Sequence, residues 1–163
     1  MDFCCLFILV SLFAATESQS TNHSSTRTDM ETAIADMRSQ SFYGFAILLQ
    51  MVRDTFRQYQ QDLTFFMPID QELSKGSVSA DHLQSFMLSH SVMKPLSFSD
   101  LNHFPSGTMV PSGLRNRLIK IQNHGAQNFS VNNALVITPN VCLNTAIKCH
   151  GINAVLKFGN DSD

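Results

Sequence analysis

The stretch Leu63-Thr64-Phe65-Phe66-Met67-Pro68-Ile69-Asp70 decides how the rest of the chain is interpreted. Its first part is apolar, rich in aromatic side chains and of strand length, which favours a strand buried on both faces over a helix. Pro68 has no N–H for a ladder and biases the residue before it toward extended backbone, so the strand is predicted to end there. Asp70 is predicted to cap a short turn over residues 71–73, because its carboxylate can accept from unpaired N–H groups at a helix start.

The composition is that of one globular domain with extensions. The chain has 163 residues, of which 44% are apolar and 15% are charged, and this argues against a disordered or nucleic-acid-binding protein. No basic cluster exceeds two closely spaced charges, as at Arg115 and Arg117. A chain of this length buries about two thirds of its unfolded surface, so it needs no disulfide scaffold.

An N-terminal apolar run predicts a cleaved secretory signal over residues 1–20. Residues 4–15 are mostly apolar and are followed by small and polar residues. The run is shorter than the roughly 20 apolar residues that span a bilayer, although it lacks the positive charge that usually opens a signal. Cleavage would remove Asp2 and Glu17 from the 13 acidic residues and leave 11 against 11 basic ones. Such a balance does not favour electrostatic steering.

The same cleavage would leave two cysteines, Cys142 and Cys149. In an oxidising compartment they are candidates for one disulfide, which closes a loop too small to constrain the unfolded chain strongly. A metal site is the competing interpretation, and no clear His or Cys partner at ligand spacing supports it. The disulfide is therefore the favoured prediction, and no metal or other cofactor is expected.

Secretion would make three Asn-x-Ser sequons available for N-glycosylation, beginning at Asn22, Asn128 and Asn160. Asn128 lies beside a turn predicted at His124-Gly125, whereas Asn160 lies close to the end of the sequence. Asn128 is therefore the best placed of the three.

The sequence is divided into a leader, a domain and a tail. Residues 21–32 are polar and rich in Ser and Thr, and they are predicted to be a flexible leader. The domain is predicted to cover residues 33–158, and residues 159–163 form a polar tail.

Helices are predicted in the first part of the domain. Apolar residues recur at helical spacing over 42–56, with Ser41 available as the N-cap. A second helix is predicted to start at Ser79, and its apolar face includes His90. A lone histidine on such a face more often donates to a backbone carbonyl than binds a metal or catalyses a reaction.

The second part of the domain changes to the period of strands. Apolar and polar residues alternate over 119–122 and again over 129–132. Asn132-Asn133 can supply the positive φ angles of a tight hairpin turn, and residues 150–156 are predicted to form the last strand. Helices followed by antiparallel strands indicate an α+β domain.

Taken together, these segments resemble the fasciclin domain of secreted and cell-surface adhesion proteins, over residues 33–158. Their order and spacing carry the resemblance more than any one segment does. The segments are Thr64-Phe65-Phe66-Met67-Pro68-Ile69-Asp70, similar to a first box Thr-x-Phe-x-Pro-x-Asp; Leu83 to Val92, similar to a helix that ends in Tyr-His; and Val131-Asn132-Asn133-Ala134 with His150-Gly151-Ile152-Asn153, similar to an Asn-Gly hairpin followed by a His-x-Ile-Asp strand.

Three departures from the family pattern bear on function. Ser89 stands in place of the tyrosine, so the tyrosine-histidine pair implicated in integrin recognition by animal members is broken and no integrin site is carried over. Asn133 replaces a glycine, which a left-handed backbone tolerates. Asn153 replaces an aspartate, which removes a charge but keeps an acceptor. The resemblance therefore implies the fold more strongly than a recognition site.

What the resemblance implies is an antiparallel β-sandwich or wedge with helices packed along one edge, acting in adhesion or cell-wall assembly rather than in catalysis. The chain is similar to single-domain relatives of plant fasciclin-like arabinogalactan proteins, but has only 5 dispersed prolines and no glycan stalk. Residues 157–163 are polar where an anchor signal would be apolar. We expect an extracellular protein without a membrane anchor that meets a protein or a cell-wall polysaccharide and no nucleic acid, with its oligomeric state left open.

The alternative is a secreted hydrolase that uses His90 or His150 with a nearby serine. Neither a Gly-x-Ser-x-Gly elbow nor a His-Glu-x-x-His helix is present in the sequence. Ser89 is not expected to form a dyad with His90, because neighbouring residues on a helix do not face one another. Both histidines are predicted to tie a helix or strand end to the backbone.

Overall fold

The structure is a computed structural model that describes residues 21–56, 62–125, 128–142 and 146–159, with side chains from residue 29 onward. The predicted signal over 1–20 lies outside the described residues. The helices are α1 (Thr21–Ser39), α2 (Tyr43–Phe56), α3 (Asp70–Leu73), α4 (Ala80–Ser89) and α5 (Phe98–His103). The strands are β1 (Leu63–Pro68), β2 (Ser91–Val92), β3 (Thr108–Pro111), β4 (Leu118–Asn123), β5 (Phe129–Val131), β6 (Ala134–Thr138) and β7 (Ile147–Ile152).

The strands form one mixed sheet of seven strands in the order β2-β1-β7-β6-β5-β4-β3. β1 and β7 run parallel, with Leu63 opposite Ile147, and all the other neighbouring pairs in this order are antiparallel. The prediction of a purely antiparallel sheet is therefore wrong, because an apolar run carries no information about the direction of its strand. The last strand also begins earlier than predicted and ends at Ile152.

The two edges of the sheet meet and nearly close it into a barrel. The N–H of Gly113, just after edge strand β3, donates to the carbonyl of Ser91 in edge strand β2 over 2.9 Å. A Cβ on Gly113 would overlap Met93 Cε and would lie 2.5 Å from Ser91 Oγ and 3.1 Å from the Leu88 carbonyl oxygen. Glycine is therefore the residue that permits this close approach.

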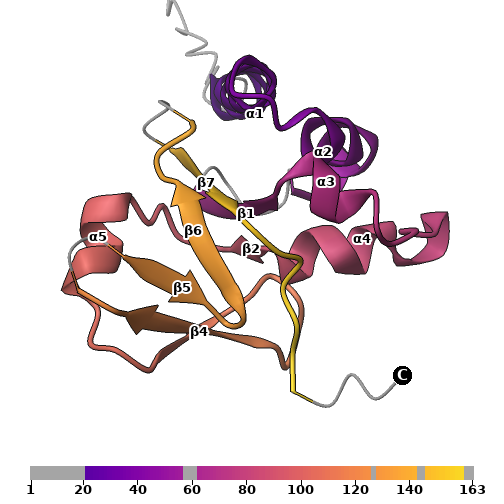
Figure 1. The fold of residues 1–163 in the computed structure, drawn as a ribbon. Coiled ribbons are helices and arrows are strands. Elements are labelled where there is room, and N and C mark those ends of the chain that lie inside the picture. The colour runs from indigo at the N-terminus through magenta and orange to yellow at the C-terminus, as the bar shows by residue number, and fades with distance from the viewer. Residues whose placement is uncertain (1–20, 57–61, 126–127, 143–145, 160–163) are drawn as a thin grey trace, which may run out of the picture.

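Strand β1 is buried along its whole length, as predicted, because each of its faces meets a separate apolar cluster. Leu63, Phe65 and Met67 pack with α1, α2 and α4, whereas Phe66 points into the interior of the curled sheet. In Figure 1, α1 to α4 lie together on one side of the molecule and α5 lies at the opposite end. β1 and β7 thus separate the helical layer from the barrel interior.

Helix α1 replaces the flexible leader predicted over residues 21–32. Met30, Ala33, Ile34 and Met37 are buried in the helical cluster. Their spacing of i, i+3, i+4 and i+7 is that of one apolar helical face, which the polar composition of the preceding residues concealed. The helical cluster consequently includes Met30, which precedes the boundary predicted at residue 33.

Of the predicted helix cap at Ser41 and the predicted hairpin turn at Asn132-Asn133, the structure contains the hairpin turn. Helix α2 forms over the predicted segment, but Ser41 does not cap it, since Ser41 adopts a left-handed φ of 66° in the turn after α1. β5 and β6 are joined by the predicted hairpin turn at Asn132-Asn133, in which Asn132 has a φ of 52°. Asn133 is not among the described residues with positive φ, so the left-handed position is one residue earlier than the resemblance implied.

Candidate functional site

His90 is buried at the end of α4 and connects this helix to the C-terminal segment. Its Nδ1 lies 2.9 Å from the Phe86 carbonyl oxygen, and its Nε2 lies 3.0 Å from the Leu156 backbone nitrogen. A carbonyl can only accept and a backbone N–H can only donate, so Nδ1 carries the proton and Nε2 accepts. Burial lowers the pKa of His90 to about 4, outweighing the contact with the Phe86 carbonyl that raises it. His90 therefore ties the end of α4 to the backbone of the C-terminal segment, and a structural role stays the prediction for it.

Ser89 does approach His90, contrary to the expectation that the two would point apart. Ser89 Oγ lies 3.1 Å from His90 Nδ1, because His90 has already left the helix as its C-cap. The serine hydroxyl donates to the Phe86 carbonyl over 2.7 Å, and the facing Nδ1 is itself a donor. A general base needs an unprotonated nitrogen toward the hydroxyl, so the pair is not arranged as a catalytic dyad.

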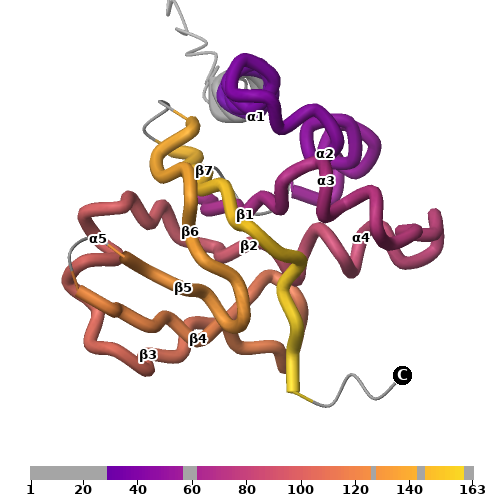
Figure 2. Tube along the Cα trace, viewed as in Figure 1, coloured from indigo at the N-terminus to yellow at the C-terminus, as the bar shows by residue number. Residues whose placement is uncertain are grey.

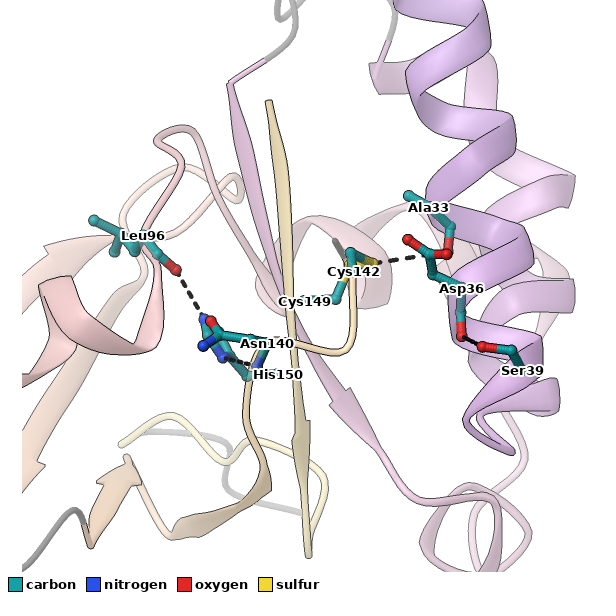
Figure 3. The surroundings of a disulfide bond; sticks show 8 residues. All are labelled: Ala33, Asp36, Ser39, Leu96, Asn140, Cys142, Cys149 and His150. Atoms are coloured by element: carbon teal, nitrogen blue, oxygen red, sulfur yellow. Dashed lines mark hydrogen bonds between the residues drawn. A yellow bond between two sulfur atoms is a disulfide. The ribbon is translucent and has the colours of Figure 1, made fainter. Parts of the chain in front are cut away.

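His150 plays the corresponding part in β7 (Figure 3). Its Nε2 donates to the Leu96 carbonyl over 2.8 Å, and its Nδ1 accepts from the Asn140 backbone N–H over 3.2 Å. Burial is the main cause that lowers its pKa, and Lys148 acts in the same direction against the Leu96 contact. Both ring nitrogens are thus engaged with backbone groups.

Asp70 does not cap its own short helix. The N-cap of α3 is Ile69, without a side-chain cap, and Asp70 Oδ1 instead accepts from the Gly44 N–H in the first turn of α2 over 2.9 Å. The carboxylate is favourable there because the helix N-terminus carries unpaired N–H groups and a partial positive charge. The predicted chemistry is thus present, but it serves a helix distant in sequence.

The cysteines are bonded to each other and lie against the helical layer. Cys142 and Cys149 form the predicted disulfide, with Cα atoms 5.0 Å apart. Figure 3 shows this bond between β7 and α1, where Cys142 Sγ lies 3.7 Å from the Ala33 carbonyl oxygen. Both cysteines are buried.

Asn128 is the one predicted glycosylation site whose side chain is described. It is exposed in the turn between β4 and β5, next to buried Phe129. The hydroxyl of Ser130, the third residue of this sequon, contacts His124 Nε2 over 2.9 Å. Asn22 lies in α1 without a described side chain, and Asn160 lies outside the described residues.

An exposed groove is the feature that the sequence interpretation missed. It is a hollow of about 450 Å³ between the β3–β4 connection and the segment that follows β7. Figure 2 shows this segment descending from β7 toward the C-terminus. We call it the β3–β4 groove, and it is lined by Met109, Asn116, Arg117, Leu118, Phe158 and Gly159. The sequence signal that could have revealed it is the absence of any Asp or Glu between Asp100 and Asp161, which neither the basic clusters nor the total charge reflects.

The described residues contain neither a candidate metal site nor a candidate membrane-spanning helix. No group of three or more His, Cys, Asp or Glu side chains there is placed to hold a metal ion. None of the helices within those ranges combines the length and apolar character needed to cross a bilayer.

Comparison with known proteins agrees with this architecture. A family model of the fasciclin domain matches residues 40–158. A FAS1 domain-containing protein from Selaginella moellendorffii is 24% identical over 133 residues, covering 80% of this chain and 50% of that protein. A solved FAS1 domain pair from the insect cell adhesion molecule Fasciclin I has a TM-score of 0.50 and 16% identity, covering 82% of this chain and 45% of that chain. The solved structure supports the fold, and the chain spans about half the length of both relatives.

Proposed function

The chain belongs to the fasciclin domain family, and we propose on this basis that it is a secreted, non-enzymatic adhesion module of the cell wall or extracellular matrix. Fasciclin domains are cell-adhesion modules. The proposed partner is an extracellular protein or a cell-wall polysaccharide that contacts the exposed surface of the sheet.

The side chains proposed for the hydrolase alternative are hydrogen-bonded to the backbone, and this supports a binding role over catalysis. Both ring nitrogens of His90 and of His150 are engaged with backbone groups, and both rings are buried. The hydroxyl of Ser89 is directed to a carbonyl. Catalysis needs a base within reach of a substrate proton, and these histidines offer no available lone pair. This observation carries the preference for adhesion over the hydrolase.

Secretion is tested by expressing the full precursor in a eukaryotic secretory host and analysing the medium by intact-mass and glycopeptide mass spectrometry. The expected product has lost residues 1–20, carries a glycan on Asn128 and is two hydrogens lighter for the Cys142–Cys149 bond. An Asn128→Gln variant, which should lose only the glycan, is the matched control. Unprocessed protein with free thiols retained in the cells would remove the extracellular compartment from the proposal.

Adhesion is tested separately with the purified protein coupled to beads. Coated beads should adhere to isolated cell-wall or matrix fragments more than beads coated with the same protein after denaturation. Equal adhesion of both bead types would contradict the proposed function. A multivalent bead is the suitable format, because adhesion can depend on many individually weak contacts.

A further inference from the structure

The charges of this chain are divided unevenly along its sequence. Between Asp100 and Asp161 there is no acidic residue, whereas five basic residues occur there. They are Arg115, Arg117, Lys120, Lys148 and Lys157. The near-neutral total therefore conceals a cationic second half, and local fields rather than net charge decide what a surface attracts.

The β3–β4 groove combines one of these cations with apolar walls. The guanidinium of Arg117 lies over the ring of Phe158, with its central carbon 5.4 Å from the ring centroid. Met109 and Leu118, which also line the groove, are 49% and 47% exposed. The stacking orients the guanidinium, and an oriented guanidinium loses less conformational freedom when it binds a carboxylate.

Two further basic residues adjoin residues that line this groove. Lys120 lies directly opposite Met109 in the β3–β4 ladder, and both residues are exposed. Asn132 joins Lys120 to Lys157, because its Oδ1 accepts from the Lys120 N–H over 2.8 Å and its Nδ2 donates to the Lys157 carbonyl over 2.9 Å. Lys157 is exposed and precedes Phe158, a lining residue, in the sequence.

The remaining two basic residues, Arg115 and Lys148, do not line the groove. Arg115 is exposed, two residues before Arg117. Lys148 contributes electrostatically to lowering the pKa of the Asp100 carboxyl at the start of α5, and it is not a lining residue of the groove. The cations that line the groove or adjoin its lining residues are therefore Arg117, Lys120 and Lys157.

We propose that the β3–β4 groove binds a polysaccharide that carries carboxylates, that is, a chain of uronate sugars. Arg117 would form a bidentate pair with one carboxylate, while Lys120 and Lys157 attract its neighbours along the chain. The CH-rich faces of the sugar rings would pack on Met109 and Leu118. This inference rests on the proposed function, of which it names the ligand class.

The chemistry of the groove favours a uronate chain over other anions. Three cations are fewer than the 6–10 phosphate contacts typical of proteins that bind nucleic acid tightly. An acidic peptide would satisfy the same charges, but it must lose more conformational entropy on binding than a chain of rigid pyranose rings. The exposed apolar side chains beside Arg117 match a ligand that alternates apolar ring faces with carboxylates.

The test is a titration of the full chain with polygalacturonate, in which binding is measured by calorimetry at low and at physiological salt. The expected binding weakens with salt and is absent with fully methyl-esterified polygalacturonate, which keeps the rings but has no charge. An R117Q/K120Q variant should bind at least about tenfold more weakly, the loss expected when about 1.4 kcal/mol of charge contacts is removed. A K75Q/K94Q variant changes the same charge elsewhere and should bind as the parent does.

A second variant guards against local unfolding, because Arg117 also covers Phe158. K120Q/K157Q leaves that stack intact and should likewise weaken binding. Unchanged affinity in both groove variants, or no binding to polygalacturonate at all, would overturn the inference. Tighter binding to poly-glutamate than to polygalacturonate would do the same and would assign the groove to an acidic protein.

The bead assay separates this inference from the proposed function. Beads that adhere although the protein does not bind polygalacturonate would leave the adhesion proposal in place and remove only its ligand class. Beads that fail to adhere, whatever the titration gives, would contradict the adhesion proposal itself.

Discussion

His90 and His150 hold opposite tautomers, because their backbone partners are arranged in opposite order. His90 carries its proton on Nδ1, toward the Phe86 carbonyl, whereas His150 carries it on Nε2, toward the Leu96 carbonyl. In each ring the other nitrogen accepts from a backbone N–H. Both histidines therefore stabilise the fold only as neutral rings, since a second proton would face a donor.

Replacing His90 by alanine should lower the free energy of unfolding by about 1–3 kcal/mol, the cost of leaving buried backbone groups unpaired. The Phe86 carbonyl and the Leu156 N–H lose their side-chain partner in this variant. Chemical denaturation of parent and variant measures the difference. His82→Ala is the matched control, because His82 is exposed and should change stability by less than about 0.5 kcal/mol. Equal effects of the two substitutions would contradict the structural role of His90.

The same rings make stability depend on pH in a defined direction. The folded pKa of His90 is lowered to about 4 from 6.5, and that of His150 is lowered as well. Between these values the unfolded chain binds more protons, so stability is complete above about pH 6.5 and falls as the pH drops toward 4. Urea unfolding at pH 7, 6 and 5 should show this loss before most carboxylates titrate. A His90→Gln variant should show a shallower loss, and a slope equal to that of the parent would contradict the assignment.

Helix α1 could be predicted from the spacing of its apolar residues but not from its polar composition. Residues 21–32 are polar enough to suggest a flexible leader, yet Met30 begins an apolar face that continues through Met37. The apolar positions were visible in the sequence at helical spacing. Strand β1 was predictable for the opposite reason, since a short apolar run that ends in proline leaves few alternatives.

Replacing Met30 by alanine should destabilise the protein by about 2–5 kcal/mol, as expected for a buried methionine that leaves a cavity. Met30 is 7% exposed and packs in the cluster that includes α2 and β7. Met51→Ala in α2 is the control, because Met51 is 65% exposed and the same atoms are deleted. Thermal and denaturant unfolding of both variants provides the measurement. A Met30→Ala protein as stable as the Met51→Ala protein would restore the leader interpretation.

The arrangement of the whole chain depends on contacts between distant residues, and these were the least predictable. The order of helices and strands, the β5–β6 hairpin and the disulfide partners followed from local patterns. The parallel pairing of β1 with β7 did not, because both directions bury the same side chains. Asp70 was expected to cap the turn that follows it, but it accepts from the start of α2, and nothing local identifies Gly44 as its partner. The groove was missed because Arg117 and Phe158 meet only after folding.

The two edges of the sheet approach each other at Gly113. Its N–H reaches the Ser91 carbonyl, and Ser91 Oγ in turn donates to the Leu88 carbonyl over 2.9 Å. A Cβ at position 113 would lie 2.5 Å from that hydroxyl, so it must displace either the β3–β4 connection or the side chain of buried Ser91. Both responses weaken the contact between the two edge strands, and overpacking of this kind costs about 1–3 kcal/mol.

Gly113→Ala should therefore lower the free energy of unfolding by that amount and make the amide of residue 113 exchange faster with solvent, because its hydrogen bond to Ser91 lengthens. Gly76→Ala is the control, since Gly76 is exposed and a Cβ there would meet nothing within 4 Å. It should be neutral or slightly stabilising through the entropy of the unfolded chain. Denaturant unfolding and hydrogen exchange are measured on both. If residue 113 remained protected in a fully stable Gly113→Ala protein, β2 and β3 would be held together by other contacts and the sheet would not depend on this glycine to close.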